Sequence, residues 1–516
     1  MDEDRIENQG RDRAAAGPQP NAAAAGAVAL VTVETGTLAG ARSADVERFL
    51  GIPFAAAPSG PLRWRPPQPA AAWPGQRAAV AFGNDCVQNR PQWDRMSSDL
   101  PLGEDCLYLN VWRPAQRAEA ALPVMVWIHG GGFVMGSSGT PVLDGSAIAR
   151  RGIVVVSFNY RLGRFGFFAH PVLSAAQHDE PLGNYGLMDQ IAALRWVRRN
   201  IGAFGGDAGN ITIFGDSAGG TSVLQLMAID QARGLFHKAI AQSAGGRDPW
   251  PHLRRATHRP SAEAIGERFA REAGLREPTP EALRALPAEL LRGGLDLVNM
   301  EPDTYSGPMI DGTLVTGPAA QAFAAGHHAR VPLLSGFTSN ELGDLPAPLR
   351  DMMVQRCLAL LDLPRERIEA LYGGAEGLSR GLVSDFPFAE PARHVAALCA
   401  AAGAPSFLYV FDYVVESLRT AVHGAAHATD VPYVFSTLTR LWPQATTADE
   451  AQSALMLDYW TQFARAGDPN CAGRPRWPVY RGDSMAFWFG QDGPALRALA
   501  ATRLDAIEAA RTAARN

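Results

Sequence analysis

The sequence predicts an α/β fold with a large, mostly parallel central sheet flanked by helices. Residues 124–128 form an unbroken apolar run that ends in glycines, and residues 153–160 repeat this pattern, which is typical of buried strands. Between that run and the apolar segment 211–214, residues 189–206 carry apolar side chains at helical spacing. The strand, helix, strand order predicts strands that lie parallel in one sheet.

Similar patterns predict further strands of this sheet, both before and after the segment 124–214. A helical pattern at 218–229 and an apolar run at 236–243 continue the alternation. Short β-rich runs open the chain, as edge strands do, at 29–36, 46–55 and 107–112. We therefore expect antiparallel or edge strands before the parallel centre.

The second half of the chain interrupts this alternation twice. Residues 247–330 and 345–402 hold prolines, charges and helical patterns, and we interpret both as helical cap insertions over the sheet. Further predicted elements are strands at 331–337 and 406–413, a helix at 454–466 ended by Gly467, and a C-terminal helix from about residue 494. We expect one catalytic domain over 27–516, preceded by a flexible tail at 1–26.

Composition excludes several classes of function. Hydrophobic residues make up 47% of the 516 residues and charged residues 19%, which suits a globular protein. The net charge of -5 is spread without basic blocks, so no nucleic-acid partner is expected and a small neutral or amphiphilic ligand fits better. The apolar run 22–33 is shorter than the roughly 20 residues that span a bilayer, so we expect no membrane span.

The cysteines and the first residues bear on the compartment. The five cysteines show no C-x-x-C metal pattern, and their odd number does not suggest a disulfide framework. Residues 1–20 mix acids with arginines, unlike a secretory leader, so a cytoplasmic location is expected. A disulfide between Cys86 and Cys106 would instead indicate a secreted or periplasmic protein.

Ser217 stands in the segment Gly215-Asp216-Ser217-Ala218-Gly219, between an apolar strand and a helical pattern. In this strand-turn-helix context, the small neighbours permit a sharp turn that leaves the hydroxyl exposed. An ordinary Gly/Ser turn is the alternative interpretation. We predict that Ser217 is a nucleophile.

A nucleophilic serine needs donors for the oxyanion that its attack creates. The segment 129–133, His-Gly-Gly-Gly-Phe, ends an apolar strand, and its glycines let backbone N–H groups turn toward negative charge. We predict Gly131, Gly132 and the amide of Ala218 as the oxyanion hole. A phosphate loop would need a G-K-[ST] ending, which this segment lacks. His129 is expected to order the loop rather than to act as the base.

Several motifs together resemble one family. They are "EDCLYLNVWRP" at 104–114, "HGGGF", "NYRLG" at 159–163, "NYGLMDQIAALRWVRRNI" at 184–201, "FGGDAGNITIFGDSAGG" at 204–220 and "GLFHKAIAQS". These segments are similar to the type B carboxylesterases, the cholinesterase-like branch of the α/β-hydrolases, from about residue 28 to 470. The resemblance implies an α/β-hydrolase fold and a serine hydrolase that cleaves carboxylic esters without a metal or cofactor.

The resemblance also implies the acid and the base. The family pattern G-x-x-x-[DN]-E falls on residues 336–341 and makes Glu341 the acid, although Leu342 stands where the family usually has glycine. Asp344 is the local alternative. The family's histidine, followed three residues later by an acid and then an apolar-aromatic run, is His427; His423 does not fit that register. The order nucleophile, acid, base is that of α/β-hydrolases.

Alternative functions and sites are also compatible with this sequence. The same triad could attack carbamates, amides or thioesters, and some cholinesterase-like proteins are non-catalytic binding modules, which typically lack a triad residue. His423 and His427 have a zinc-like spacing, but no glutamate follows the first histidine, so no metal is expected. Phe133 and Trp93 are candidate pocket residues. The position of Trp93 relative to Cys106 does not favour choline esters.

Overall fold

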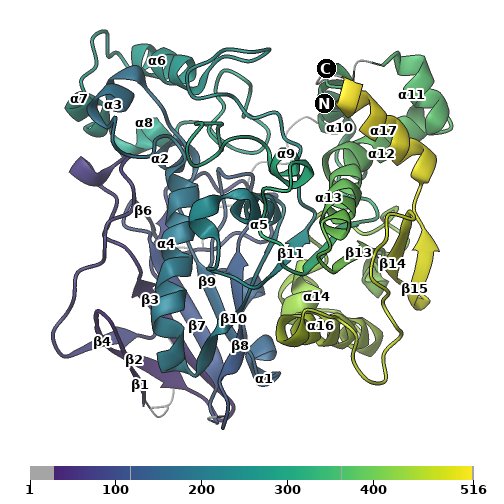
Figure 1. The fold of residues 1–516 in the computed structure, drawn as a ribbon, viewed down its shortest axis with the longest axis horizontal. Helices are drawn as coiled ribbons and strands as arrows, with labels where there is room; N and C mark the ends of the chain where they lie inside the picture. Colours follow the sequence, from purple (N-terminus) through teal and green to yellow (C-terminus); the bar gives the residue numbers. More distant parts are fainter. Residues whose placement is uncertain (1–27, 117, 362, 514–516) are drawn as a thin grey trace, which may run out of the picture.

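Thirteen strands form one sheet in the described part of the chain (Figure 1). The computed structural model describes residues 28–513 except 117 and 362. In sheet order the strands are β1 (Val28–Val33), β2 (Gly36–Arg42), β3 (Val46–Pro53), β7 (Tyr108–Pro114), β9 (Val154–Phe158), β8 (Leu122–Ile128), β10 (Gly206–Asp216), β11 (Lys238–Gln242), β12 (Leu333–Thr338), β13 (Ser406–Phe411), β14 (Met485–Gly490) and β15 (Gly493–Ala498), with β4 (Gln76–Ala79) beside β2. A separate two-stranded pair joins β5 (Asp85–Cys86) to β6 (Leu102–Gly103).

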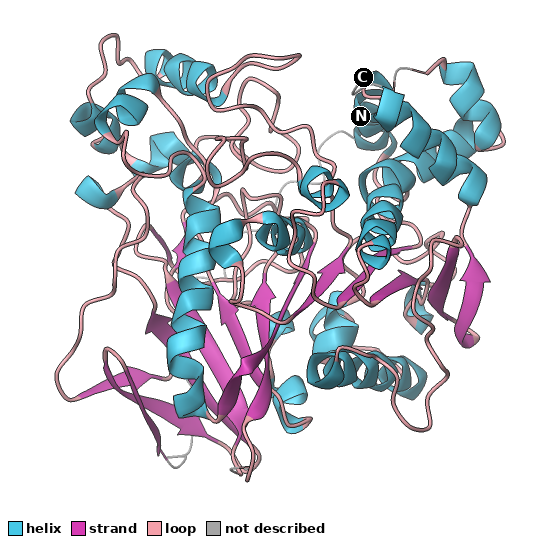
Figure 2. Ribbon diagram, in the orientation of Figure 1, coloured by secondary structure: helices cyan, strands magenta, loops and turns pink. Residues whose placement is uncertain are grey.

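The sheet is parallel at its centre and antiparallel at its edges. Neighbouring strands from β9 to β14 pair in parallel. The path from β1 to β9 and the final pair β14–β15 are antiparallel, while β4 pairs with β2 in parallel. The predicted mostly parallel central sheet flanked by helices is confirmed (Figure 2).

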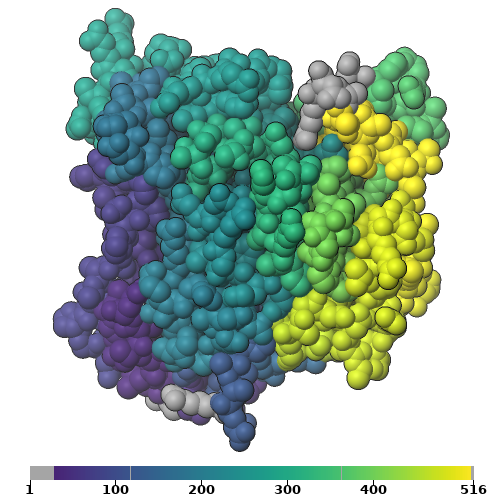
Figure 3. All heavy atoms as spheres, viewed as in Figure 1, coloured from purple at the N-terminus to yellow at the C-terminus, as the bar shows by residue number. Residues whose placement is uncertain are grey.

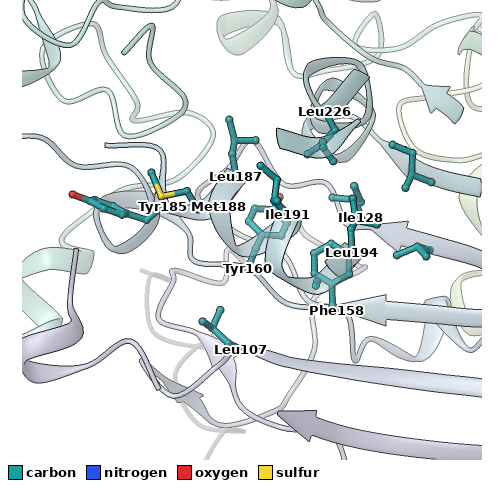
Figure 4. Close-up of a cluster of buried hydrophobic side chains, with 14 of the residues drawn as sticks. Leu107, Ile128, Phe158, Tyr160, Tyr185, Leu187, Met188, Ile191, Leu194 and Leu226 are labelled. Atoms are coloured by element: carbon teal, nitrogen blue, oxygen red, sulfur yellow. The ribbon is translucent and has the colours of Figure 1, made fainter. Parts of the chain in front are cut away.

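The central strands β8 and β9 are almost entirely apolar because helices cover both faces of the sheet. Helices α4 (Tyr185–Asn200) and α5 (Ala218–Ala228) cover one face. Figure 4 shows their side chains meeting those of the strands in the larger core cluster, with labels on Leu107, Ile128, Phe158, Tyr160, Tyr185, Leu187, Met188, Ile191, Leu194 and Leu226. On the opposite face a second cluster gathers around α16 (Thr447–Ala466).

The remaining helices fall mainly in the two segments predicted as caps. The segment 247–330 contains α6 (Ala262–Glu272), α7 (Pro280–Arg284), α8 (Ala288–Arg292) and α9 (Ala319–Ala324), and the segment 345–402 contains α10 (Ala347–Ala359), α11 (Arg365–Leu371), α12 (Ala375–Ser384), a π-helical turn at Asp385–Ala389 and α13 (Glu390–Ala401). In Figure 1, α6 to α8 and α10 to α12 lie above the strands, in two groups. The cap role and the single domain stay predictions, and the predicted tail 1–26 lies outside the described residues.

Six further α-helices are described, and none of the helices within the described ranges is long and apolar enough to cross a bilayer. They are α1 (Ser146–Arg150), α2 (Gly163–Gly166), α3 (Pro171–Ala176), α14 (Val431–Phe435), α15 (Leu438–Leu441) and the C-terminal α17 (Ala501–Ala513).

The C-terminal prediction was partly wrong. Helix α16 ends as predicted at Gly467, whose φ of 73° is the left-handed conformation that glycine adopts at helix ends. The predicted helix from about residue 494 begins only at Ala501, because residues 493–498 pair with β14 as an antiparallel edge strand. Tertiary pairing overrides the helix propensity of its alanines.

Two of the sequence motifs meet in a buried ion pair. Arg161, from the segment 159–163, donates through Nη2 to Oδ1 of Asp189 at 2.7 Å, and its Nε and backbone N–H both donate to Oδ2. Asp189 lies on α4 and both side chains are almost fully buried. Removing one partner would leave an uncompensated buried charge, so this pair fixes how α4 sits on the loop after β9.

Candidate active site

Ser217 lies at a sharp turn between β10 and α5. Its φ of 58° and ψ of -121° are unusual for a residue with a side chain and store roughly 1–3 kcal/mol of strain. The glycines around it are required: a Cβ on Gly219 would come within 2.0 Å of the carbonyl oxygen of Ile128, and one on Gly215 within 2.6 Å of the same atom. The predicted strained elbow is present at this position.

The glycine loop lies beside this elbow. A Cβ placed on Gly130 would be 3.2 Å from the Cβ of Ser217. Gly131 has a φ of 102°, and a Cβ there would meet the carbonyl oxygen of Met135 at 2.1 Å; Gly132 has a φ of 60°. Ala218 begins α5, and the first N–H groups of a helix have no partner within it. The three predicted donors therefore belong to two adjoining turns.

His129, at the head of the loop, is buried and stacked on Tyr160, with 4.4 Å between the ring centroids. Burial lowers the pKa of its imidazole to about 4, so the ring is neutral at physiological pH. Its Nδ1 lies 2.9 Å from the carbonyl oxygen of Gly130. These contacts order the loop, the role that the sequence suggested for this histidine.

Glu341 and His427 are joined through side chain and backbone. Nδ1 of His427 lies 2.5 Å from Oε2 of Glu341, and the backbone N–H of His427 donates to the carbonyl oxygen of Glu341 at 2.8 Å. Glu341 is buried, whereas the His427 side chain is 23% exposed. The imidazole is thus anchored at its inner edge by a carboxylate and open at its outer edge.

The end of β11 connects the elbow to both groups. The backbone N–H of Ser217 donates to the carbonyl oxygen of Gln242 at 2.9 Å, and the hydroxyl of Ser243 donates to Oε1 of Glu341 at 2.7 Å. The side-chain amide of Gln242 donates to Oδ2 of Asp430 at 2.9 Å. Neither Gln242 nor Ser243 was predicted from the sequence. Their place at the carboxyl end of a central parallel strand is the signal that could have found them.

Three acids surround the imidazole. Burial by itself lowers the pKa of His427. The hydrogen-bonded carboxylate of Glu341 and the carboxyls of Asp216 and Asp430 together outweigh burial, so the pKa of His427 is raised to about 9. Burial also raises the pKa of Asp430, to about 6, and that of Asp216.

This arrangement gives a testable pH dependence. If His427 is the base, it works when neutral, so kcat/KM is expected to rise with pH through a pKa above 6.5. Asp430→Asn can still accept the bonds from Gln242 and Tyr409 but removes a negative charge. We expect the rising limb to move to lower pH with its plateau retained, measured as kcat/KM against pH with a neutral ester. A limb that stays in place or moves to higher pH would contradict this account of His427.

The alternatives for acid and base form their own pair. His423 is exposed, and its Nδ1 lies 2.6 Å from Oδ1 of Asp344, which also pairs with Arg380 at 3.0 Å. Asn340 donates to the other oxygen of Asp344. Asp344 and His423 thus form a second carboxylate–imidazole pair, whose substitution can serve as a control for the pair formed by Glu341 and His427.

The two candidate pocket residues differ in exposure. Phe133 is buried with a φ of 65°, and its ring packs edge-on against Phe167 at 5.4 Å. Its carbonyl oxygen accepts a hydrogen bond from the N–H of Gly163 at 2.7 Å. Trp93 is 56% exposed. The role of both in a pocket stays a prediction.

One group in the described part of the chain places three potential metal ligands near one another: Glu390, His394 and Glu508, whose atoms lie within 4.8 Å. Arginines already pair with its carboxylates, Arg511 with Glu390 and Arg393 with Glu508. A cation would compete with these guanidinium groups, so the cluster functions as an ion-pair network.

The chain is similar to known proteins over most of its length. A model of the Carboxylesterase family matches residues 27–351 and 377–498. The chain is 35% identical to fumonisin B1 esterase of Sphingopyxis macrogoltabida over 463 residues, which cover 86% of this chain and 83% of that one. It is 34% identical to para-nitrobenzyl esterase of Bacillus subtilis over 468 residues, 87% of this chain and 92% of that one.

A solved structure of PNB esterase superposes with a TM-score of 0.80 at 31% identity, covering 91% of this chain and 96% of that chain. The fold is therefore that of the α/β-hydrolases, and the activity of the family is the hydrolysis of carboxylic esters by a serine hydrolase. The predicted resemblance is confirmed, and the chain belongs to the carboxylesterase family.

Proposed function

We propose that Ser217 is the nucleophile of this carboxylesterase, with His427 as its general base and Glu341 as the group that orients the imidazole. The observation that carries the proposal is the 2.5 Å contact between Nδ1 of His427 and Oε2 of Glu341. A serine hydroxyl is a weak nucleophile until a base takes its proton. A histidine held at Nδ1 by a carboxylate presents its Nε2 for that task.

The reaction then follows the acyl-enzyme route. Ser217 attacks the ester carbonyl as its proton passes to His427, and the amides of Gly131, Gly132 and Ala218 stabilise the oxyanion. The imidazolium, whose charge Glu341 offsets, returns the proton to the departing alcohol. Water repeats the sequence on the acyl-enzyme and releases the acid. No metal or cofactor takes part in this proposal.

The proposed substrates are small neutral or amphiphilic esters. The net charge of -5 is spread along the sequence without a long run of one sign, which favours a neutral or amphiphilic substrate, and the two relatives described above are named as esterases for different compounds. Carbamates, amides and thioesters are the second candidates, because the same groups can attack their carbonyls. We place Phe133 and Trp93 in the substrate pocket.

A substrate panel tests the proposal. Initial rates on p-nitrophenyl acyl esters, acyl anilides and aryl carbamates are compared, and the enzyme is acid-quenched during turnover for mass spectrometry of the peptide that contains Ser217. We expect the esters to react fastest and the acyl mass to appear on that peptide. Faster carbamate or anilide turnover would favour the second candidates. Ester turnover with the acyl group on another residue would overturn the proposal, and no turnover at all would point to a binding protein.

We also infer a cytoplasmic location, supported by the state of Cys86 and Cys106. Both are buried free cysteines, and the N–H of Leu162 donates to Sγ of Cys86 at 3.2 Å. A hydrogen bond with Cys86, together with burial, raises the pKa of the Cys106 thiol. Two adjacent thiols of this kind suit a reducing compartment, whereas their disulfide would suit the periplasm or secretion.

A further inference from the structure

We propose that Phe388 is a positioning residue for the catalytic imidazole, and that the C-terminal helix α17 holds it in place by fixing the π-helical turn at Asp385–Ala389. We call this segment the π turn. The inference rests on the proposed role of His427 as the general base.

The aromatic ring of Phe388 packs on the face of the imidazole. The ring centroids of Phe388 and His427 are 4.7 Å apart, with the planes inclined by 35°. The bond from Nδ1 to Glu341 fixes one edge of the imidazole but leaves the ring free to tilt about that bond. A flat side chain against one face opposes this tilt and so keeps Nε2 directed toward its target.

The π turn explains why Phe388 reaches the imidazole. The segment lies between α12 and α13 and has the i→i+5 pattern, which is rare and often occurs at functional sites. An extra residue in one turn rotates all following side chains by roughly 100° relative to a continuous α-helix. Phe388 is only half-buried within this turn, so its ring can lie against His427 while Phe386 points into the core.

Helix α17 contacts the π turn at two points. At its start, Nε of Arg503 lies 3.0 Å from Oδ2 of Asp385, which also accepts a hydrogen bond from the hydroxyl of Tyr372 at 2.9 Å. Further along, Nη2 of Arg511 donates to the carbonyl oxygen of Phe386 at 2.5 Å, and the guanidinium carbon lies 3.8 Å from the centroid of the Phe386 ring. The turn is thus held through both its backbone and its side chains.

Buried charges secure the end of the turn. Glu390, the first residue of α13, is fully buried and pairs with Arg247, while Nε of Arg511 lies 3.2 Å away in an ion pair that lacks hydrogen-bond geometry. Arg393 of α13 pairs with Asp505 of α17 at 2.6 Å. Buried ion pairs contribute little net stability, but breaking one is costly, so they specify one arrangement.

Helix α17 lies on the outside of the molecule, although its arginines contact the π turn that carries Phe388. Figure 3 shows the C-terminal segment, in yellow, packed over the green helices on the outside of the molecule. None of its described side chains takes part in the proposed chemistry, yet two of its arginines hold the turn that carries Phe388. We therefore expect changes in α17 to alter the chemical step more than substrate binding.

The first test removes the ring. Phe388→Ala is expected to lower kcat roughly tenfold to hundredfold, the scale of a small misplacement of a catalytic group, with KM little changed. Phe388→Tyr keeps the ring and is expected to restore kcat. Titration with a p-nitrophenyl phosphonate counts reactive serines, so kcat is expressed per intact site. An unchanged kcat with an altered KM would mean that Phe388 only lines the pocket and would overturn the inference.

The second test loosens the turn from a distance. Arg511→Lys keeps a positive charge near Glu390 but loses the flat guanidinium on Phe386, and we expect a several-fold loss in kcat per site. Arg497→Lys is the matched control, since this exposed arginine of β15 pairs only loosely with Asp492, at 4.0 Å, and lies outside the contacts that hold the π turn. If the Arg511 variant has the same kcat per site as the Arg497 variant, α17 does not hold the π turn in the way proposed, and its role is overturned.

His427→Gln separates this inference from the proposed function. If His427→Gln retains the wild-type kcat, His427 is not the base, and both proposals fail. If His427→Gln is inactive while Phe388→Ala keeps the wild-type kcat and KM, only the positioning role of Phe388 fails.

Discussion

Replacement of Ser217 by alanine is expected to lower kcat for ester hydrolysis by roughly 10⁵- to 10⁶-fold, the loss seen when a serine hydrolase loses its nucleophile. The variant retains the glycine loop and the imidazole, so residual catalysis should come from binding and oxyanion stabilisation alone. Initial rates on p-nitrophenyl esters, with enzyme from a strain lacking other esterases, measure the effect. Wild-type turnover by the alanine variant would exclude Ser217 as the nucleophile.

A glycine variant controls for the fold. Alanine keeps the φ of 58° and its strain, whereas glycine adopts this conformation freely. Glycine relieves the strain of the folded state, and this gain is larger than the loss of stability caused by the greater entropy of the unfolded glycine chain. The free energy of unfolding of Ser217→Gly should therefore be higher than that of Ser217→Ala by about 1 kcal/mol. Denaturant unfolding of the two inactive variants measures this difference. Equal stability would mean that the elbow is not strained.

The sequence predicted those parts of the fold that local patterns specify. Strands β8 and β9 were predictable because a strand covered on both faces must be apolar throughout. Strand β15 was not, because it lies at the edge of the sheet with mostly exposed or half-buried side chains, and only its pairing with β14 makes it a strand. Its alanines and arginine also suit a helix, so the local pattern indicated the wrong element.

The candidate site likewise contains residues that a local motif predicts and residues that no local motif predicts. Ser217 and the glycine loop have short motifs whose backbone geometry requires glycine at fixed positions. Ser243 and Phe388 have no such motif, because their importance comes from contacts with residues distant in the sequence, 98 positions away for Ser243 and Glu341. The general rule that site residues follow central parallel strands would have indicated Ser243. No comparable rule exists for a phenylalanine in a π turn.

Glu341→Gln is expected to lower kcat by roughly 10⁴-fold with little change in KM, because it imposes the wrong tautomer on His427. Oε1 of Glu341 accepts hydrogen bonds from the hydroxyl of Ser243 and the backbone N–H of Thr338, both at 2.7 Å. In the variant these two donors hold the amide oxygen of glutamine, which turns the NH₂ group toward Nδ1 of His427. Nδ1 must then accept a hydrogen bond, so the proton moves to Nε2, which can no longer take the proton of Ser217.

Asp344→Asn is the matched control for this substitution. It makes the same carboxylate-to-amide change three residues away, at an acid whose histidine partner is His423. We expect its kcat to stay within about twofold of the wild type, because His423 is exposed and the oxygen of asparagine can still accept a hydrogen bond. Parallel kinetics of the two variants, each checked by thermal unfolding, therefore distinguish the two acids. A large loss in the Asp344 variant and a small one in the Glu341 variant would assign the acid to Asp344, because only the carboxylate on the working imidazole controls its tautomer.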